Sequence, residues 1–136
     1  MRQPFDVIHG AEGWQLSNPP ILSMAAIRAS LDMFDEIGMP VLREKSEKLT
    51  GYFEYLINQI GSASIKIITP SNPKERGCQL SIQVKNADKR LHKKLAEKNI
   101  ITDWREPDVI RCAPVPMYNS FQDVFKMVEI LRSVLA

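Results

Sequence analysis

The sequence predicts an α+β domain: a mainly antiparallel sheet of about four strands with helices mostly on one face, preceded by a long helix. Two patterns support this. Apolar residues recur every three or four positions over several long stretches, and they alternate with polar residues over 78–84. With 136 residues, 44% of them hydrophobic, the chain can form one domain with a sizeable core. We divide it into an extended N-terminal segment, 1–20, and a C-terminal domain with its leading helix, 21–136.

The first half of the chain predicts two consecutive helices. In the motif S-N-P-P at 17–20, Asn18 and Pro19 should be extended, because a residue that precedes proline avoids the helical region, while Pro20 suits a first helical turn. Gly38 should end the first helix, whose two apolar lines imply cover on two sides, partly from outside the domain. The second helix should run from Pro40 to Gly61, with an inner line formed by Leu42, Lys45, Leu49, Tyr52, Phe53, Leu56 and Ile60.

The second half of the chain predicts the sheet. Its turn-rich segments separate four short strands, which we expect at 65–68, 78–84, 100–105 and 109–113. Residues 106–108 should form the turn between the last two strands. A short helix over 88–98 should bury Leu91 and Leu95.

A final helix should begin near Asn119 or Ser120. Either residue can cap it, with Gln122 or Asp123 three positions on as the reciprocal partner. Its expected core line is Phe121, Val124, Phe125, Val128, Leu131 and Leu135.

The composition argues against several classes of function. Eighteen basic and 16 acidic residues are mixed along the chain, so no cationic face indicates nucleic acid. No apolar run approaches the ~20 residues of a membrane span, and the N-terminus lacks a secretory signal, so we expect a cytoplasmic protein. Cys78 and Cys112 lie in apolar runs and should be free core thiols, while His9 and His92 are too far apart to predict a metal site. No phosphate-binding loop or nucleophile motif indicates a self-contained catalytic site.

Arg111 is the most informative single residue, because it places a charge inside the apolar stretch I-R-C-A-P-V. A guanidinium loses its water cheaply only if an anion replaces it, and its planar fork suits a carboxylate. A carboxylate ligand is therefore one interpretation. The other is a structural arginine with its head in water, or one paired with Glu106 or Asp108. The residues alone favour the structural interpretation, because structural arginines outnumber ligand-binding ones.

Four motifs in order, S-N-P-P-I, L-T-G-Y-x-E-Y-L-I, I-I-T-P-S-x-x-x-E-R-G-C-Q-L and I-R-x-A-P-V-P-x-Y-N-S-F, resemble the C-terminal part of kynureninase. The resemblance covers nearly the whole chain from about Trp14. Kynureninases are pyridoxal 5'-phosphate enzymes of the aspartate aminotransferase fold type. They hydrolyse L-kynurenine, or its 3-hydroxy form, to anthranilate, or 3-hydroxyanthranilate, and L-alanine.

The resemblance implies that the chain is the small C-terminal domain and its leading helix, with the large cofactor-binding domain absent. The family's Schiff-base lysine lies on that large domain. We therefore expect no catalytic residue in this chain, no cofactor bound to it alone and no activity of its own. Family members are homodimers, which implies the same for the full-length protein.

Two positions carry over from the family. Arg111 matches the arginine that grips the substrate's α-carboxylate, and Asn18 matches the asparagine that reaches the cofactor site. For Asn18, the residues alone favour a simple helix N-cap. Cys112 stands where the family usually has valine, a small change that we expect to leave the direction of Arg111 unaltered.

Two other classes of function stay open on the sequence. One is a stand-alone regulatory module in which Arg111 binds an amino-acid carboxylate without catalysis. The other is a partner protein that uses its leading helix only for dimerisation.

Overall fold

The computed structural model describes residues 6–135. The chain forms two compact units that meet between Gly38 and Met39, so the leading helix belongs to the first unit and the rest of the C-terminal domain to the second. Each unit is described by itself. Residues 1–5 of the segment predicted to be extended lie outside the described part, and the remainder of that segment includes a 3-10 turn, η1, at Ala11–Trp14.

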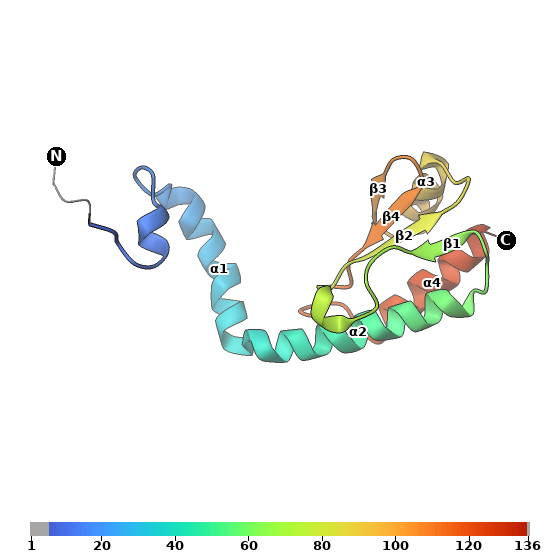
Figure 1. The fold of residues 1–136 in the computed structure, drawn as a ribbon, viewed down its shortest axis with the longest axis horizontal. Coiled ribbons are helices and arrows are strands. Elements are labelled where there is room, and N and C mark those ends of the chain that lie inside the picture. Colours follow the sequence, from blue (N-terminus) through green and yellow to red (C-terminus); the bar gives the residue numbers. More distant parts are fainter. Residues whose placement is uncertain (1–5, 136) are drawn as a thin grey trace. The chain divides into compact units, whose positions relative to one another are not determined.

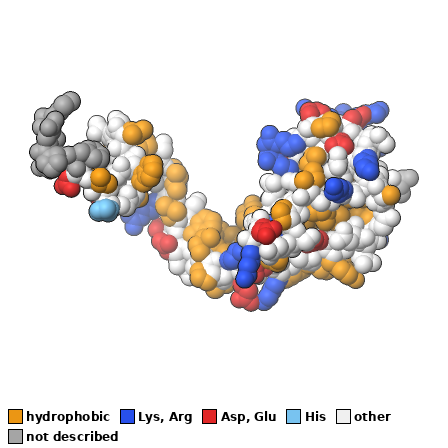
Figure 2. Space-filling model, in the orientation of Figure 1, with side chains coloured by type: hydrophobic (Ala, Val, Ile, Leu, Met, Phe, Trp, Pro, Cys, Tyr) orange, Lys and Arg blue, Asp and Glu red, His pale blue; other side chains and the backbone are white. Residues whose placement is uncertain are grey.

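The first unit contains helix α1, Ile21–Ile37. Pro20 occupies the N-cap position rather than the first turn, and no side chain caps the helix there. The helix ends at Gly38 as predicted, where φ is 82° and the Gly38 N–H donates to the Phe34 carbonyl at 2.8 Å. No residue of α1 is buried, and Figure 2 shows apolar side chains along it. The cover predicted for its two apolar lines is therefore not supplied within this unit.

The second unit is built on a four-stranded sheet with the order β1-β2-β4-β3 (Figure 1). All three neighbouring pairs are antiparallel, which confirms the predicted sheet. The strands are shorter than predicted: β1 is Ile65–Ile67, β2 is Leu80–Val84, β3 is Asp103–Arg105 and β4 is Val109–Cys112. A second 3-10 turn, η2 at Pro73–Glu75, lies between β1 and β2.

Three helices accompany the sheet: α2 at Met39–Gln59, α3 at Lys89–Glu97 and α4 at Phe121–Leu135. Helix α4 packs against both α2 and α3, and Figure 1 shows it running beside α2. Side chains cap the starts of α3 and α4, and the reciprocal cap of α4 confirms the prediction from the sequence. Asp88 accepts a hydrogen bond from the Arg90 N–H, and Ser120 and Asp123 accept from each other's backbone N–H groups. Within residues 6–135, no helix is long and apolar enough to cross a membrane.

The core lies between the sheet and these helices and includes Phe53, Leu80, Ile82 and Ile110. The predicted burial of Leu91 and Leu95 is confirmed. Three details were wrong: Phe121 and Phe125 are 45% and 41% exposed, Met127 is buried in their place, and Cys78 is only half-buried.

The inner face of α2 also includes two polar residues that were not predicted there, Ser46 and Thr50, which are buried. Lys45 of the predicted line is half-buried. The Thr50 hydroxyl donates to the Ser46 carbonyl at 2.8 Å, which satisfies a buried polar group within the helix.

Candidate functional site

Arg111 lies near the middle of the sheet, on β4, with Ser81 of β2 and Asp103 of β3 directly opposite it. Side chains alternate between the two faces of a strand, and Ile110 and Cys112 on either side of Arg111 belong to the core. Arg111 therefore lies on the face opposite the core. Alternation alone places the guanidinium on this open face of the sheet, which α2, α3 and α4 do not cover.

Arg111 is paired within its own domain. Its Nε donates to Asp103 Oδ2 at 2.8 Å, and its Nη2 donates to the same oxygen. The prediction that Glu106 or Asp108 pairs with Arg111 was wrong, because the antiparallel register brings Asp103 opposite Arg111. Asp108 instead accepts two hydrogen bonds from Gln83, at 3.1 and 3.2 Å.

The Arg111 side chain is 32% exposed, so the expectation of a charge stranded among apolar neighbours was wrong. Its apolar neighbours in sequence point to the other face of the sheet. Among residues 6–135, no group accepts a hydrogen bond from Arg111 Nη1. The open face therefore carries an arginine with one edge engaged and one edge available.

Asp103 is the residue of this site that sequence reasoning missed. It also accepts from Arg105, through Nε at 3.2 Å and Nη2 at 3.0 Å. The hydrogen bond from Arg111 lowers the pKa of Asp103. Desolvation opposes this effect, while the charges of Arg105 and Arg111 add to it, so that the pKa stays below its ordinary value. The signal in the sequence was the alternation D-W-R at 103–105, with charges on both sides of a tryptophan that packs toward the core.

Asn18 lies in the first unit, at a bend two residues before Pro20, and is exposed. Because Pro20 is the N-cap position of α1 and no side chain caps that helix, the interpretation of Asn18 as a simple N-cap was wrong. Asn18 and Arg111 belong to different units.

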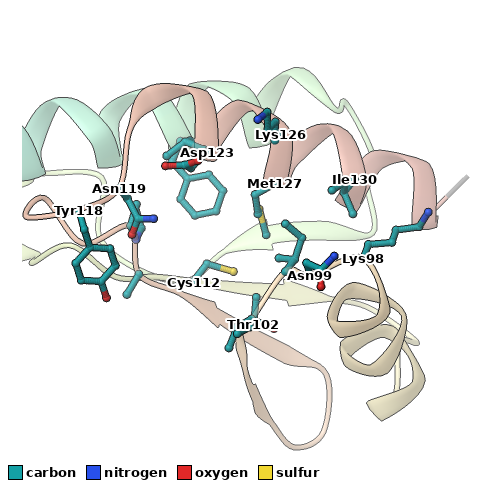
Figure 3. A pocket seen from close by; sticks show the side chains of 16 residues that line it. Lys98, Asn99, Thr102, Cys112, Tyr118, Asn119, Asp123, Lys126, Met127 and Ile130 are labelled. Atoms are coloured by element: carbon teal, nitrogen blue, oxygen red, sulfur yellow. The ribbon is translucent and has the colours of Figure 1, made fainter.

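A separate hollow of about 660 Å³ lies on the helix side of β4 (Figure 3). Cys112 and Met127 point into it from β4 and α4, while Tyr118 and Lys98 lie toward opposite ends. Burial raises the pKa of the Cys112 thiol to about 12, so this thiol is a poor nucleophile. Arg111 is not among the lining residues.

The lysines of the chain do not fit a Schiff-base site. A lysine that forms such a bond is usually activated in a desolvated pocket. Every lysine here is exposed except Lys45, which is half-buried on α2. Within the described residues, no group of three or more His, Cys, Asp or Glu side chains could hold a metal ion.

Comparison with known proteins places this geometry in a family context. Residues 42–131 match the family described as the kynureninase C-terminal domain. A kynureninase of Myxococcus xanthus (strain DK1622) is 50% identical over 132 residues, covering 97% of this chain and 31% of that protein. A kynureninase of Xanthomonas campestris pv. campestris (strain B100) is 53% identical over 123 residues, covering 88% of this chain and 29% of that protein.

These curated relatives are much longer than the chain, which spans less than a third of their length. Among solved structures, a NifS-like protein has a TM-score of 0.71 at 18% identity, covering 94% of this chain and 38% of that protein. This likeness shows a shared fold, in agreement with the α+β domain predicted from the sequence.

Proposed function

The chain belongs to the kynureninase family as its C-terminal domain, and we propose on this basis that Arg111 binds the α-carboxylate of the substrate in the whole enzyme. The reaction would be hydrolysis of L-kynurenine or 3-hydroxykynurenine to L-alanine and the corresponding anthranilate. The observation that carries the proposal is the position of Arg111 on the open face of the sheet, with Nη1 available. A second carboxylate can approach that edge of the guanidinium.

Arg111 would act by binding and orienting the substrate. A carboxylate held by two N–H groups fixes one end of the molecule, which restricts how the scissile bond lies relative to the reacting groups. The open face of the sheet would then be turned toward the rest of the enzyme, where the reaction takes place.

The cofactor expected for the family is pyridoxal 5'-phosphate, which supplies an electron sink for bond cleavage. Because no lysine of this chain lies in a desolvated pocket, we assign its covalent attachment to residues outside the chain. We propose that Asn18 reaches toward the cofactor in the whole enzyme. Its exposed amide, which caps no helix, supports this role.

We also propose that the whole enzyme is a cytoplasmic homodimer. The apolar side chains of α1 support an assembly surface, since Leu22 and Ile21 are 88% and 73% exposed. The 136-residue chain by itself should release no anthranilate from kynurenine. Release by the purified chain would contradict the assignment of the chemistry to residues outside it.

The carboxylate-binding role can be tested in a fusion in which this chain replaces the matching part of the M. xanthus kynureninase, hereafter the fusion. Arg111→Met should raise the KM for kynurenine and lower kcat/KM, because the substrate carboxylate loses its charged partner. The fall in kcat/KM should correspond to a loss of about 2 kcal/mol of transition-state stabilisation. Arg111→Lys should restore only part of the loss, because the ammonium lacks the planar fork.

Arg132→Met is the matched control, since Arg132 forms an exposed pair with Glu129 on α4, one turn from the end of the chain. It should leave kcat/KM unchanged. An Arg111→Met fusion with the KM of the unsubstituted fusion would refute the proposed role.

A further inference from the structure

We propose that Asp103 is a positioning residue that holds the guanidinium of Arg111 in the orientation needed to receive a substrate carboxylate. This inference rests on the proposed function of Arg111 and adds a residue that the comparison with relatives does not assign.

The register fixes the pair. Asp103 and Arg111 are directly opposite each other in the antiparallel β3–β4 pair, so their side chains share one face. The Asp103 carboxylate is short and is attached to a strand, which limits where its oxygens can lie. It therefore provides a firm anchor for the longer arginine side chain.

Asp103 engages one edge of the Arg111 guanidinium, and this determines which of its N–H groups remain available to a ligand. Nε and Nη2 donate to Asp103 Oδ2, so the side edge of the group is engaged. A guanidinium has five N–H donors in one plane, and the edge formed by Nη1 and the second N–H of Nη2 faces away from the side edge. The two N–H groups of that end edge are spaced to donate to the two oxygens of a carboxylate. Holding the side edge thus presents the end edge to a ligand and reduces the entropy lost on binding.

The charges on this face agree with an acidic ligand. Arg105 and Arg111 both donate to Asp103 Oδ2, so two guanidinium groups share one carboxylate and leave one positive charge. A substrate carboxylate would balance that charge. The lowered pKa of Asp103 means that its own negative charge persists at neutral pH, so the anchor stays ionised.

The pairing can be tested in the full 136-residue chain by NMR of the arginine side-chain Nε–H groups. Asp103→Asn should shift the Arg111 Nε–H signal and speed its exchange with water, while Asp103→Glu should keep part of the protection. Asp108→Asn removes the same charge from the same hairpin, where Asp108 bonds Gln83, and should leave the Arg111 signal in place. An Arg111 signal unaffected by Asp103→Asn would overturn the inference.

The positioning role can be tested kinetically in the fusion. Asp103→Asn should raise the KM for kynurenine by on the order of tenfold, with a smaller effect on kcat, because a loosely held guanidinium meets the carboxylate less often in the productive direction. Asp103→Glu should recover part of this loss and Asp108→Asn should behave like the unsubstituted fusion. A purely structural role would instead lower the amount of active protein and its Tm without raising KM, and that result would overturn the inference.

The two proposals can fail separately. If Arg111→Met raises KM and Asp103→Asn does not, Arg111 binds the carboxylate without help and only the positioning role is refuted. If Arg111→Met leaves KM unchanged, the proposed function itself is refuted.

Discussion

Arg76 Nη1 lies 2.5 Å from Glu54 Oε2, in an ion pair that joins the segment before β2 to α2. The Arg76 side chain is only 2% exposed. Arg76 also donates to the Pro70 carbonyl at 3.2 Å, and Ser71 donates to Glu54 Oε1 at 2.6 Å. The long connection between β1 and β2 is thereby fixed to the helix beneath it.

Replacement of Arg76 should destabilise the protein strongly. Arg76→Met removes one partner of a buried pair and leaves the Glu54 carboxylate partly desolvated, which typically costs about 3 kcal/mol. The free energy of unfolding from urea denaturation measures the effect. Glu47→Gln is the control, because Glu47 pairs with Arg43 in an exposed i,i+4 position and should change the free energy by no more than about 0.5 kcal/mol. Equal effects of the two substitutions would contradict this interpretation.

Glu54 should also contribute to the acid sensitivity of the fold. Burial alone would raise the pKa of Glu54, but hydrogen bonds from Ser71 and Arg76 and the Arg76 charge outweigh it and lower the pKa from its ordinary value of 4.5. A lowered pKa contributes stability that is present above the ordinary value and is lost as the pH falls through the folded value. Glu54→Gln should therefore make the loss of stability below pH 4.5 shallower. An unchanged acid limb in urea titrations would refute this contribution.

The cap of α4 should have a measurable effect on stability. Ser120→Ala removes the hydroxyl that accepts from the Asp123 N–H at 3.2 Å, which should cost about 1 kcal/mol of unfolding free energy. Ser133→Ala in the same helix removes a hydroxyl that only donates to the Ile130 carbonyl, and it should have little effect. Similar losses from both serines would show that the cap is not the cause.

Two phenylalanines should differ in their contribution to the core. Phe53→Ala should cost about 3–5 kcal/mol of unfolding free energy, because Phe53 is 2% exposed and its removal leaves a cavity between the helices and the sheet. Phe125→Ala makes the same chemical change at a side chain that is 41% exposed, and it should cost about 1 kcal/mol or less. A comparable loss at Phe125 would mean that this side chain is covered in solution.

The two cysteines should differ in their reactivity. Burial raises the pKa of the Cys112 thiol from 9.0 to about 12, so almost none of it is thiolate at pH 8 in the folded protein. Cys78 is half-buried and more accessible to a reagent. Labelling with a thiol reagent at pH 8 should therefore modify Cys78 first and Cys112 only after denaturation. In a Cys78→Ser variant, rapid labelling of the native protein would contradict the burial of Cys112.

The sequence predicted the elements whose ends are determined locally. Gly38 ends α1, and Ser120 with Asp123 begins α4, because each depends only on neighbours in the chain. The faces of α4 were harder to assign. Phe125 and Met127 are both apolar, and the packing of α4 against α2 and α3 decides which of them is buried.

In the candidate site, too, one residue could be found from the sequence and the other could not. Arg111 could be proposed as a site residue from its place in an apolar stretch of sequence and from the family resemblance, and its role stays a prediction. Its partner could not, because Glu106 and Asp108 are closer in sequence than Asp103, and only the register of the β3–β4 pair brings Asp103 opposite. The missed residue is thus one whose role depends on pairing between strands rather than on its own neighbours.

The alternation along β4 places a demand on how this strand can vary. Arg111 and Cys112 are consecutive, yet one reaches the open face while the other is packed beneath the sheet. Deleting a single residue ahead of them would turn the Cys112 thiol outward and the Arg111 guanidinium into the apolar core, which would disrupt folding and remove the proposed ligand contact. A change of strand length would therefore shift every side chain of β4 to the wrong face, whereas a substitution alters only one position.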